Sequence, residues 1–195
     1  MDCRTIAVIA VVILLSFPSM TRADSPYEGQ TLTGIKVAWM SSGTVEIDNV
    51  EGDSKSSFGA GIFFDFPYGP SVTYGFALDV LRMDWEVATE PEALDEARTM
   101  LDLSLNFKAT LAGGENARWL FRPGVAVGFG ALQRFQRLSG SNYLTLKAMG
   151  ELHYLTAGNF NFVLDATFWH APSGGDRDRD VKVGPLLLVR FGIVF

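Results

Sequence analysis

The chain has little of three things: cysteine, basic residues and long apolar runs. Its one cysteine, Cys3, stands too near the start to cross-link the body of the chain, which excludes a disulfide-stabilised scaffold. Acidic residues outnumber basic ones by 22 to 16, and this balance argues against nucleic acid as a partner. After Ala23 no apolar run approaches the roughly 20 residues that a membrane-spanning helix needs.

An apolar run does occur at the start, over Ile6 to Phe17, and it follows Arg4. This run is too short to span a bilayer as a helix. Thr21-Arg22-Ala23 then places small residues at the two positions that a signal peptidase reads. The sequence therefore predicts a secretory signal peptide over 1–23 and a single domain over 24–195.

Beyond the signal peptide, apolar residues recur with a period of two. In the segment 184–195 one face is uniformly apolar, with Leu187, Val189, Phe191, Ile193 and Phe195, whereas the other contains Arg190 and Gly192. This alternation is typical of a strand with lipid on one side and a packed polar interior on the other. Seven further segments repeat it, at about 31–42, 57–66, 72–85, 99–111, 119–132, 143–154 and 160–170.

When the eight segments are phased alike, the charged residues gather on the inward face. They are the cations Lys36, Lys108, Arg122, Lys147 and Arg190 and the anions Asp65, Asp79, Asp102, Glu151 and Asp165. A soluble barrel has the reverse polarity, and a cation facing lipid near the midplane costs about 2–4 kcal/mol. We therefore predict lipid outside and an ion-pair network inside. Lys108, Arg122, Glu151, Asp165 and Arg190 are expected in one layer, since all lie at similar distances from the short turns.

The connections between the segments alternate in length. Tight turns at 67–71, 112–118 and 155–159 alternate with longer polar stretches at 43–56, 86–97, 134–142 and 171–183. Short turns on one side and long loops on the other are typical of a transmembrane barrel with periplasmic turns and extracellular loops. The predicted fold class is all-β, an eight-stranded antiparallel transmembrane β-barrel.

Three segments resemble a known family: RPGVAVGFGAL at 122–132, LKAMGELHYL at 146–155 and the final VRFGIVF. They are similar to the OmpA/OmpX-like eight-stranded outer-membrane β-barrels. This resemblance implies a place in the outer membrane of a Gram-negative cell. It also implies that the alternating row Phe191, Ile193 and Phe195 acts as the signal read by the barrel-assembly machinery during insertion. The resemblance says little about function.

Two histidines are candidates for chemistry. His153 projects inward beside Glu151, and we interpret it as a hydrogen-bonded interior histidine. His170 and Ser173, in FWHAPSGG, resemble the His-x-Ser of outer-membrane lipid A deacylases, although the spacing here is His-x-x-Ser and 184–195 contains no acidic residue. A lipid A-modifying acyl hydrolase therefore stays as an alternative.

Acidic residues in the predicted loops raise the question of metal binding. The stretch 176–180, DRDRD, has the spacing of a calcium loop, but its two arginines neutralise it and Leu187 stands where a bidentate Glu belongs. We predict a solvated loop and no metal site or cofactor. The first two long loops are also acidic, which indicates solvation or, alternatively, bridging to lipopolysaccharide phosphates through divalent cations, with Arg134 and Arg137 contacting phosphate directly.

We expect a monomeric protein with a structural or surface-interaction role, whose partners are outer-membrane lipid and lipopolysaccharide. The alternatives are the acyl hydrolase and a narrow passive channel. Eight strands enclose a space only just wide enough for side chains to fill, which favours a closed barrel. The inward glycines favour a channel instead, because they leave space for water; they are Gly59, Gly61, Gly75, Gly124, Gly128 and Gly130.

Overall fold

The two-residue periodicity produces strands along nearly the whole of the described chain. The computed structural model describes residues 27, 29–86, 98–112, 118–133, 141–175 and 180–195. The predicted signal peptide, Arg134, Arg137 and residues 176–179 of the DRDRD stretch lie outside these ranges. Within them, no helix is long and apolar enough to cross a bilayer.

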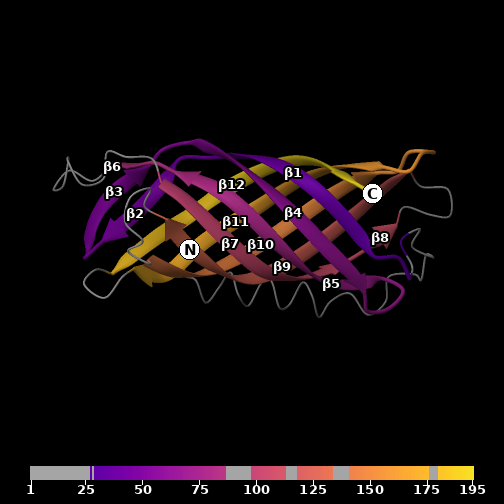
Figure 1. The fold of residues 1–195 in the computed structure, drawn as a ribbon, viewed down its shortest axis with the longest axis horizontal. Helices are drawn as coiled ribbons and strands as arrows, with labels where there is room; N and C mark the ends of the chain where they lie inside the picture. The colour runs from indigo at the N-terminus through magenta and orange to yellow at the C-terminus, as the bar shows by residue number, and fades with distance from the viewer. Residues whose placement is uncertain (1–26, 28, 87–97, 113–117, 134–140, 176–179) are drawn as a thin grey trace.

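Long antiparallel strands close into a barrel (Figure 1). They are β1 (Leu32–Met40), β4 (Ser57–Pro67), β5 (Val72–Met83), β7 (Arg98–Ala109), β9 (Trp119–Gln133), β10 (Ser141–Tyr154), β11 (Asn161–Gly175) and β12 (Val181–Val194). Each pairs with the next, and β12 pairs back with β1 from Gly34–Val194 to Met40–Leu188. Because the last strand pairs with the first, the sheet closes on itself, as a bilayer requires of strands that cross it. The predicted eight-stranded antiparallel barrel is confirmed.

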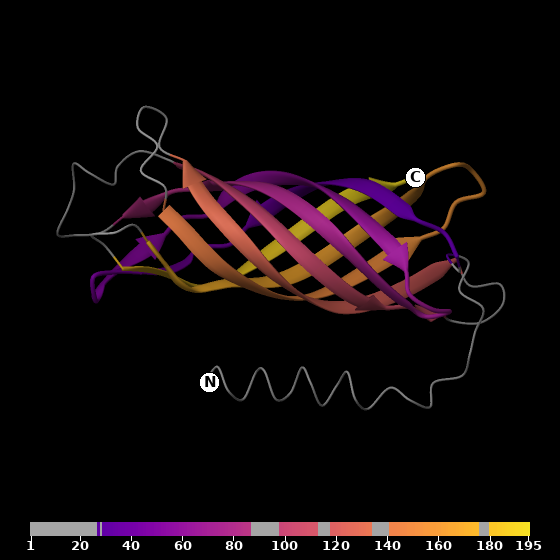
Figure 2. The ribbon, with the colours of Figure 1, turned by 60° about the horizontal axis from the view of Figure 1, so that its bottom comes forward.

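The two ends of the barrel differ in their connections. At the turn end, which contains 68–71 and 155–160, short connections join the strands and the short strand β8 (Leu111–Ala112) pairs with β9. At the loop end, the strands β2 (Gly43–Ile47), β3 (Val50–Ser54) and β6 (Trp85–Glu86) continue the sheet beyond the barrel proper. Figure 1 shows the turn end on the right and the loop end on the left, and Figure 2 shows how steeply the strands tilt.

The loop-end hairpin corrects the sequence analysis, which treats 43–56 as a polar loop. β2 and β3 pair from Gly43–Ser54 to Ile47–Val50 around a turn at Asp48 and Asn49. Both turn residues have positive φ, 51° and 67°, which is the conformation of a two-residue type I′ hairpin turn. Asp and Asn are among the few side chains that tolerate this conformation, so the turn and its register are encoded locally.

The predicted inward and outward faces are those of the structure. Large apolar side chains point outward and are exposed, as Val37 at 62%, Phe58 at 71% and Phe168 at 64% illustrate. The alternating residues, among them Lys36 and Arg122, are buried inside. A soluble protein rarely exposes so large an apolar surface, because water disfavours it. The outer surface is therefore a lipid-facing belt.

Two apolar clusters fill the ends of the interior. The loop-end cluster contains Met40, Leu81, Met100, Trp169 and Leu186 among its members, all fully buried or nearly so. The turn-end cluster contains Tyr27, Leu32, Phe63, Leu120, Val163 and Val194. The charged inward residues connect the two clusters and form the candidate site.

Candidate functional site

Ten inward charged side chains lie in one connected series of ion pairs. The series contains all five cations and all five anions that the two-residue alternation places on the inward face. Each of these side chains is at most 5% exposed. We call this set the interior network: Lys36, Asp65, Asp79, Asp102, Lys108, Arg122, Lys147, Glu151, Asp165 and Arg190. Its formal charge is zero, so each buried charge has compensation within the barrel.

The half of the interior network near the turn end is centred on Glu151. Its carboxylate contacts Lys36 Nζ at 2.6 Å, Lys108 Nζ at 2.9 Å and Arg122 Nη1 at 3.3 Å. Asp65 contacts the same Lys108 at 2.9 Å and the same Arg122 at 3.0 Å. Two acids and two bases therefore form a closed ring, in which each cation touches two carboxylates.

The other half of the interior network runs toward the loop end as a chain. Lys36 also contacts Asp165 at 2.7 Å and so joins the two halves. Arg190 then links Asp165 at 2.7 Å to Asp79 at 3.2 Å. Lys147 contacts Asp79 at 2.7 Å and Asp102 at 3.2 Å, where the series ends.

Strand register explains much of this arrangement. Glu151 on β10 stands opposite Arg122 on β9 and opposite Asp165 on β11. Asp165 in turn stands opposite Arg190 on β12. Adjacent strands thus bring Arg122, Glu151, Asp165 and Arg190 side by side, and the pleat turns all four inward. Lys108, which the sequence places at the same level, stands opposite Gly124 on β9, one inward position from Arg122, and contacts Glu151 at 2.9 Å.

Neutral donors and acceptors complete the interior network, and the sequence analysis does not identify them. Thr73 accepts from Arg122 at 2.7 Å, and Thr167 accepts from Arg190 at 2.8 Å. The indole of Trp169 donates to Asp102 at 2.6 Å. Each of these residues occupies an inward position in the two-residue alternation. Their inward direction, combined with their distance along the strand from the charged residues, could have identified them from the sequence.

A tyrosine from outside the strands closes the interior network at the turn end. The Tyr27 hydroxyl lies 3.2 Å from His153 Nδ1, and His153 Nε2 lies 3.1 Å from Glu151. A carboxylate only accepts, so Nε2 donates to Glu151; in the neutral imidazole, Nδ1 then accepts from the tyrosine hydroxyl. Burial raises the pKa of Tyr27 to about 12, which keeps its hydroxyl protonated as a donor. The predicted pairing of His153 with Glu151 is present in the structure.

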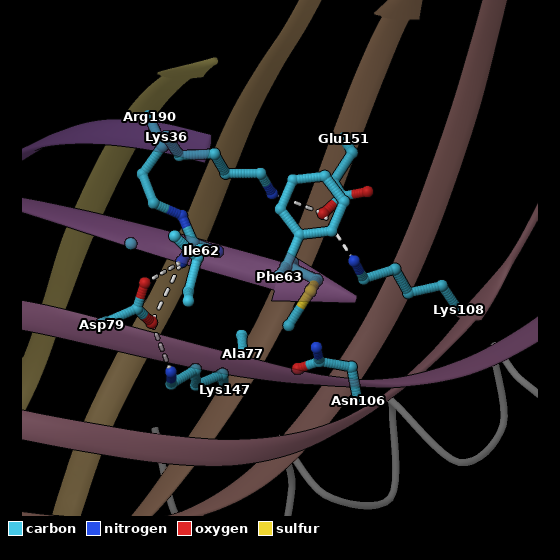
Figure 3. A pocket seen from close by; sticks show the side chains of 12 residues that line it. Lys36, Ile62, Phe63, Ala77, Asp79, Asn106, Lys108, Lys147, Glu151 and Arg190 are labelled. Carbon is cyan, nitrogen blue, oxygen red and sulfur yellow. Dashed lines mark hydrogen bonds and ion pairs between the residues drawn. The ribbon is translucent and has the colours of Figure 1, made fainter. Parts of the chain in front are cut away.

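The space beside the inward glycines is occupied by neighbouring side chains and main-chain atoms. A Cβ on Gly61 would collide with Asp79, and one on Gly128 would lie 2.7 Å from Asp102 Oδ1. The cavity within the interior network measures about 10 Å³ and is lined by Lys36, Phe63 and Asp79, among others (Figure 3). This volume holds about one water molecule. The described interior therefore leaves little space for water beside these glycines.

His170 and Ser173 both lie near the loop end of β11, but they do not form a catalytic pair. His170 Nδ1 donates to the main-chain carbonyl of Val183 at 2.7 Å. Within the part of the chain that the structure describes, no hydrogen bond joins His170 to Ser173, and Ser173 is exposed. Ser173 therefore lacks the activated geometry of a nucleophile.

The remaining predicted site residues lie on the closing strand β12 or directly after it. Phe191 and Phe195 are exposed at 51% and 60% and, with Ile193, face lipid from the turn-end half of β12. The main chain of Phe195 exchanges hydrogen bonds with Thr33 of β1. In the described ranges no group of three or more His, Cys, Asp or Glu is arranged to hold a metal ion.

Comparison with known proteins identifies the fold. No protein-family model and no curated protein matches the sequence. Among solved structures, the chain is similar to Neisserial surface protein A (NspA), with a TM-score of 0.53 and 11% identity over 84% of this chain and 95% of that one. It is similar to the outer membrane protein OprG from Pseudomonas aeruginosa, with a TM-score of 0.53 and 14% identity over 90% of this chain and 99% of that one. The chain therefore has the fold of the OmpA/OmpX-like eight-stranded outer-membrane barrels.

Proposed function

We propose that this chain is an outer-membrane β-barrel protein with a structural or surface-interaction role, whose interior network plugs the barrel. The observation that carries the proposal is the set of ten paired charges at the centre of the barrel. The lipid-facing belt supports the membrane location, and the fold shared with a protein named as a surface protein supports the outer membrane. Specificity in such barrels belongs to the loop end, because the scaffold itself is chemically uniform.

Three successive barriers support a closed interior rather than a passive channel. The loop-end cluster and the turn-end cluster are apolar, and a hydrated ion loses its shell on entering either. Between them, the cations of the interior network are held by carboxylates at hydrogen-bond distances. Conduction needs a continuous path of polar sites that bind weakly, and this packing supplies none in the described interior.

Electrical recording tests the plug directly. Refolded wild-type protein in a planar bilayer is expected to show no stable conductance steps. Arg122→Ala removes one of the two side chains that join Glu151 and Asp65 and opens space at the turn end. This variant is expected to show at most brief, irregular currents, since the loop-end cluster still blocks the path. Reproducible unitary steps from wild-type protein would contradict the plug and favour the channel.

We also propose that the outward row Phe191, Ile193 and Phe195 is read by the barrel-assembly machinery. Phe195→Asp places a charge in this apolar row beside lipid, while the main-chain bonds to Thr33 can still form. We expect several-fold less folded protein in the membrane than for wild type, measured by heat-modifiable gel migration. Phe195→Tyr is the matched control and should insert normally. Normal levels of the Phe195→Asp protein would contradict this role.

A further inference from the structure

A polar groove lies on the outer face of the loop end, separate from the interior network. It measures about 330 Å³ and crosses four strands, β11, β12, β2 and β3. Its polar lining consists of Thr44, Glu46, Glu51, His170 and Lys182, and Gly184 adds no side chain. A Cβ on Gly184 would collide with the Thr44 hydroxyl, so the hollow between His170 and Thr44 exists because residue 184 is glycine.

The groove adjoins the upper edge of the lipid-facing belt. His170 stands one outward position beyond Phe168, which is 64% exposed and pairs with Leu187. The next outward position toward the loop end is occupied by a polar row, which consists of Lys182, Glu46 and Glu51. Apolar side chains therefore form one rim and charged side chains the other. A molecule in the groove would sit at the depth of lipid headgroups, with its apolar part directed along the belt.

The chemistry of the lining indicates the kind of headgroup. Carboxylates only accept hydrogen bonds and an ammonium only donates them, whereas a sugar hydroxyl does both. Glu46 and Glu51 stand directly opposite each other, and Lys182 Nζ contacts Glu46 at 2.8 Å. Hydrogen bonding to Glu46 raises the pKa of Lys182, so the amine stays charged. His170 Nδ1 donates to the Val183 carbonyl, and in the neutral imidazole Nε2 is then an acceptor.

The charge balance selects a sugar over a bare phosphate. Two carboxylates face one ammonium across the groove, and a phosphate would be repelled by the excess negative charge. A sugar ring meets no such penalty, and its hydroxyls match the alternating donors and acceptors. We propose that this groove binds a sugar ring of a membrane-anchored glycolipid in the outer leaflet. The proposal rests on the proposed membrane location, and it names the partner of the surface-interaction role.

Glycolipid retention tests the site. Protein is placed in nanodiscs of phosphatidylglycerol with or without rough lipopolysaccharide, released in mild detergent and analysed by native mass spectrometry. Thr44→Val with Glu51→Gln removes one hydroxyl and one charge while preserving shape, and lost hydrogen bonds of this kind reduce affinity by about tenfold or more. Thr99→Val with Glu86→Gln is the matched control, since both residues lie at the loop end outside the groove. Wild type and control should retain the glycolipid, and the groove variant should lose it.

A second readout needs no variant. Lys182 is 39% exposed and open to acetylation, and an occupied groove should protect its amine. Protection is expected with rough lipopolysaccharide in the nanodisc and not with delipidated core oligosaccharide at the same concentration. Equal retention by groove and control variants, equal Lys182 acetylation with and without glycolipid, or equal protection by the free oligosaccharide would overturn the proposal. Stable channel activity would instead overturn the plug and leave these binding results unaffected.

Discussion

Glu151→Ala is expected to destabilise the barrel by about 3–5 kcal/mol, because it leaves buried cations without their shared carboxylate. Glu151 is fully buried and contacts three cations and His153. Lys108 and Arg122 would still share Asp65, but the interior would contain one uncompensated positive charge. The free energy of unfolding in urea, with the protein folded in lipid bilayers, measures the effect.

Two controls separate charge from packing. Ser173→Ala, at an exposed position, should change the free energy of unfolding by less than about 0.5 kcal/mol. Glu151→Ala combined with Lys36→Met removes one acid and one base together, and it should cost clearly less than Glu151→Ala alone, since the charge balance is restored. Equal stability of the Glu151→Ala and Ser173→Ala proteins would show that the ion pairs do not support the barrel.

The barrel could be predicted because one physical rule governs most of its length. Between the two ends, lipid requires apolar outward residues, and closure of the strands requires the rest to point inward. A residue such as Lys108 or Phe107 therefore reveals its direction by its chemistry alone. The short turns add the alternating connectivity, so strand order follows without further information.

The hairpin β2–β3 was not predicted because outward residues are no longer apolar beyond the lipid-facing belt. There the outward residues Thr44 and Glu46 are polar, while the inward Val45 and Ile47 are buried with the loop-end cluster. If outward positions are assumed to be apolar, as they are in the lipid-facing belt, the polar residues at these alternate positions predict a loop rather than a strand. The turn residues Asp48 and Asn49 carried the missing signal, since such a pair between alternating residues favours a hairpin.

The membership of the interior network could be predicted from the sequence, but its pairing could not. Inward phase identifies Lys36 as an interior cation, yet its partners Glu151 and Asp165 stand on strands far from β1 in sequence. Reaching them depends on side-chain length and on the stagger of the closed barrel. Tyr27 precedes the first strand and belongs to no periodic pattern, so only the structure reveals its contact with His153.

A charge placed on the outward face tests directly whether this face contacts lipid. Val127 is 46% exposed in the middle of the outward row of β9, and it stands between Leu105 and Leu146. Val127→Arg should therefore reduce the free energy of unfolding from a bilayer by about 2–4 kcal/mol, the cost of a cation near the midplane. Val72→Arg is the matched control, since Val72 is 41% exposed but begins β5 beside the turn end. There the guanidinium reaches the headgroups, and the cost should fall to about 0–1 kcal/mol. A depth-independent cost at the two positions would show that this surface does not face a bilayer, and with it the assignment of lipid outside and charge inside would fail.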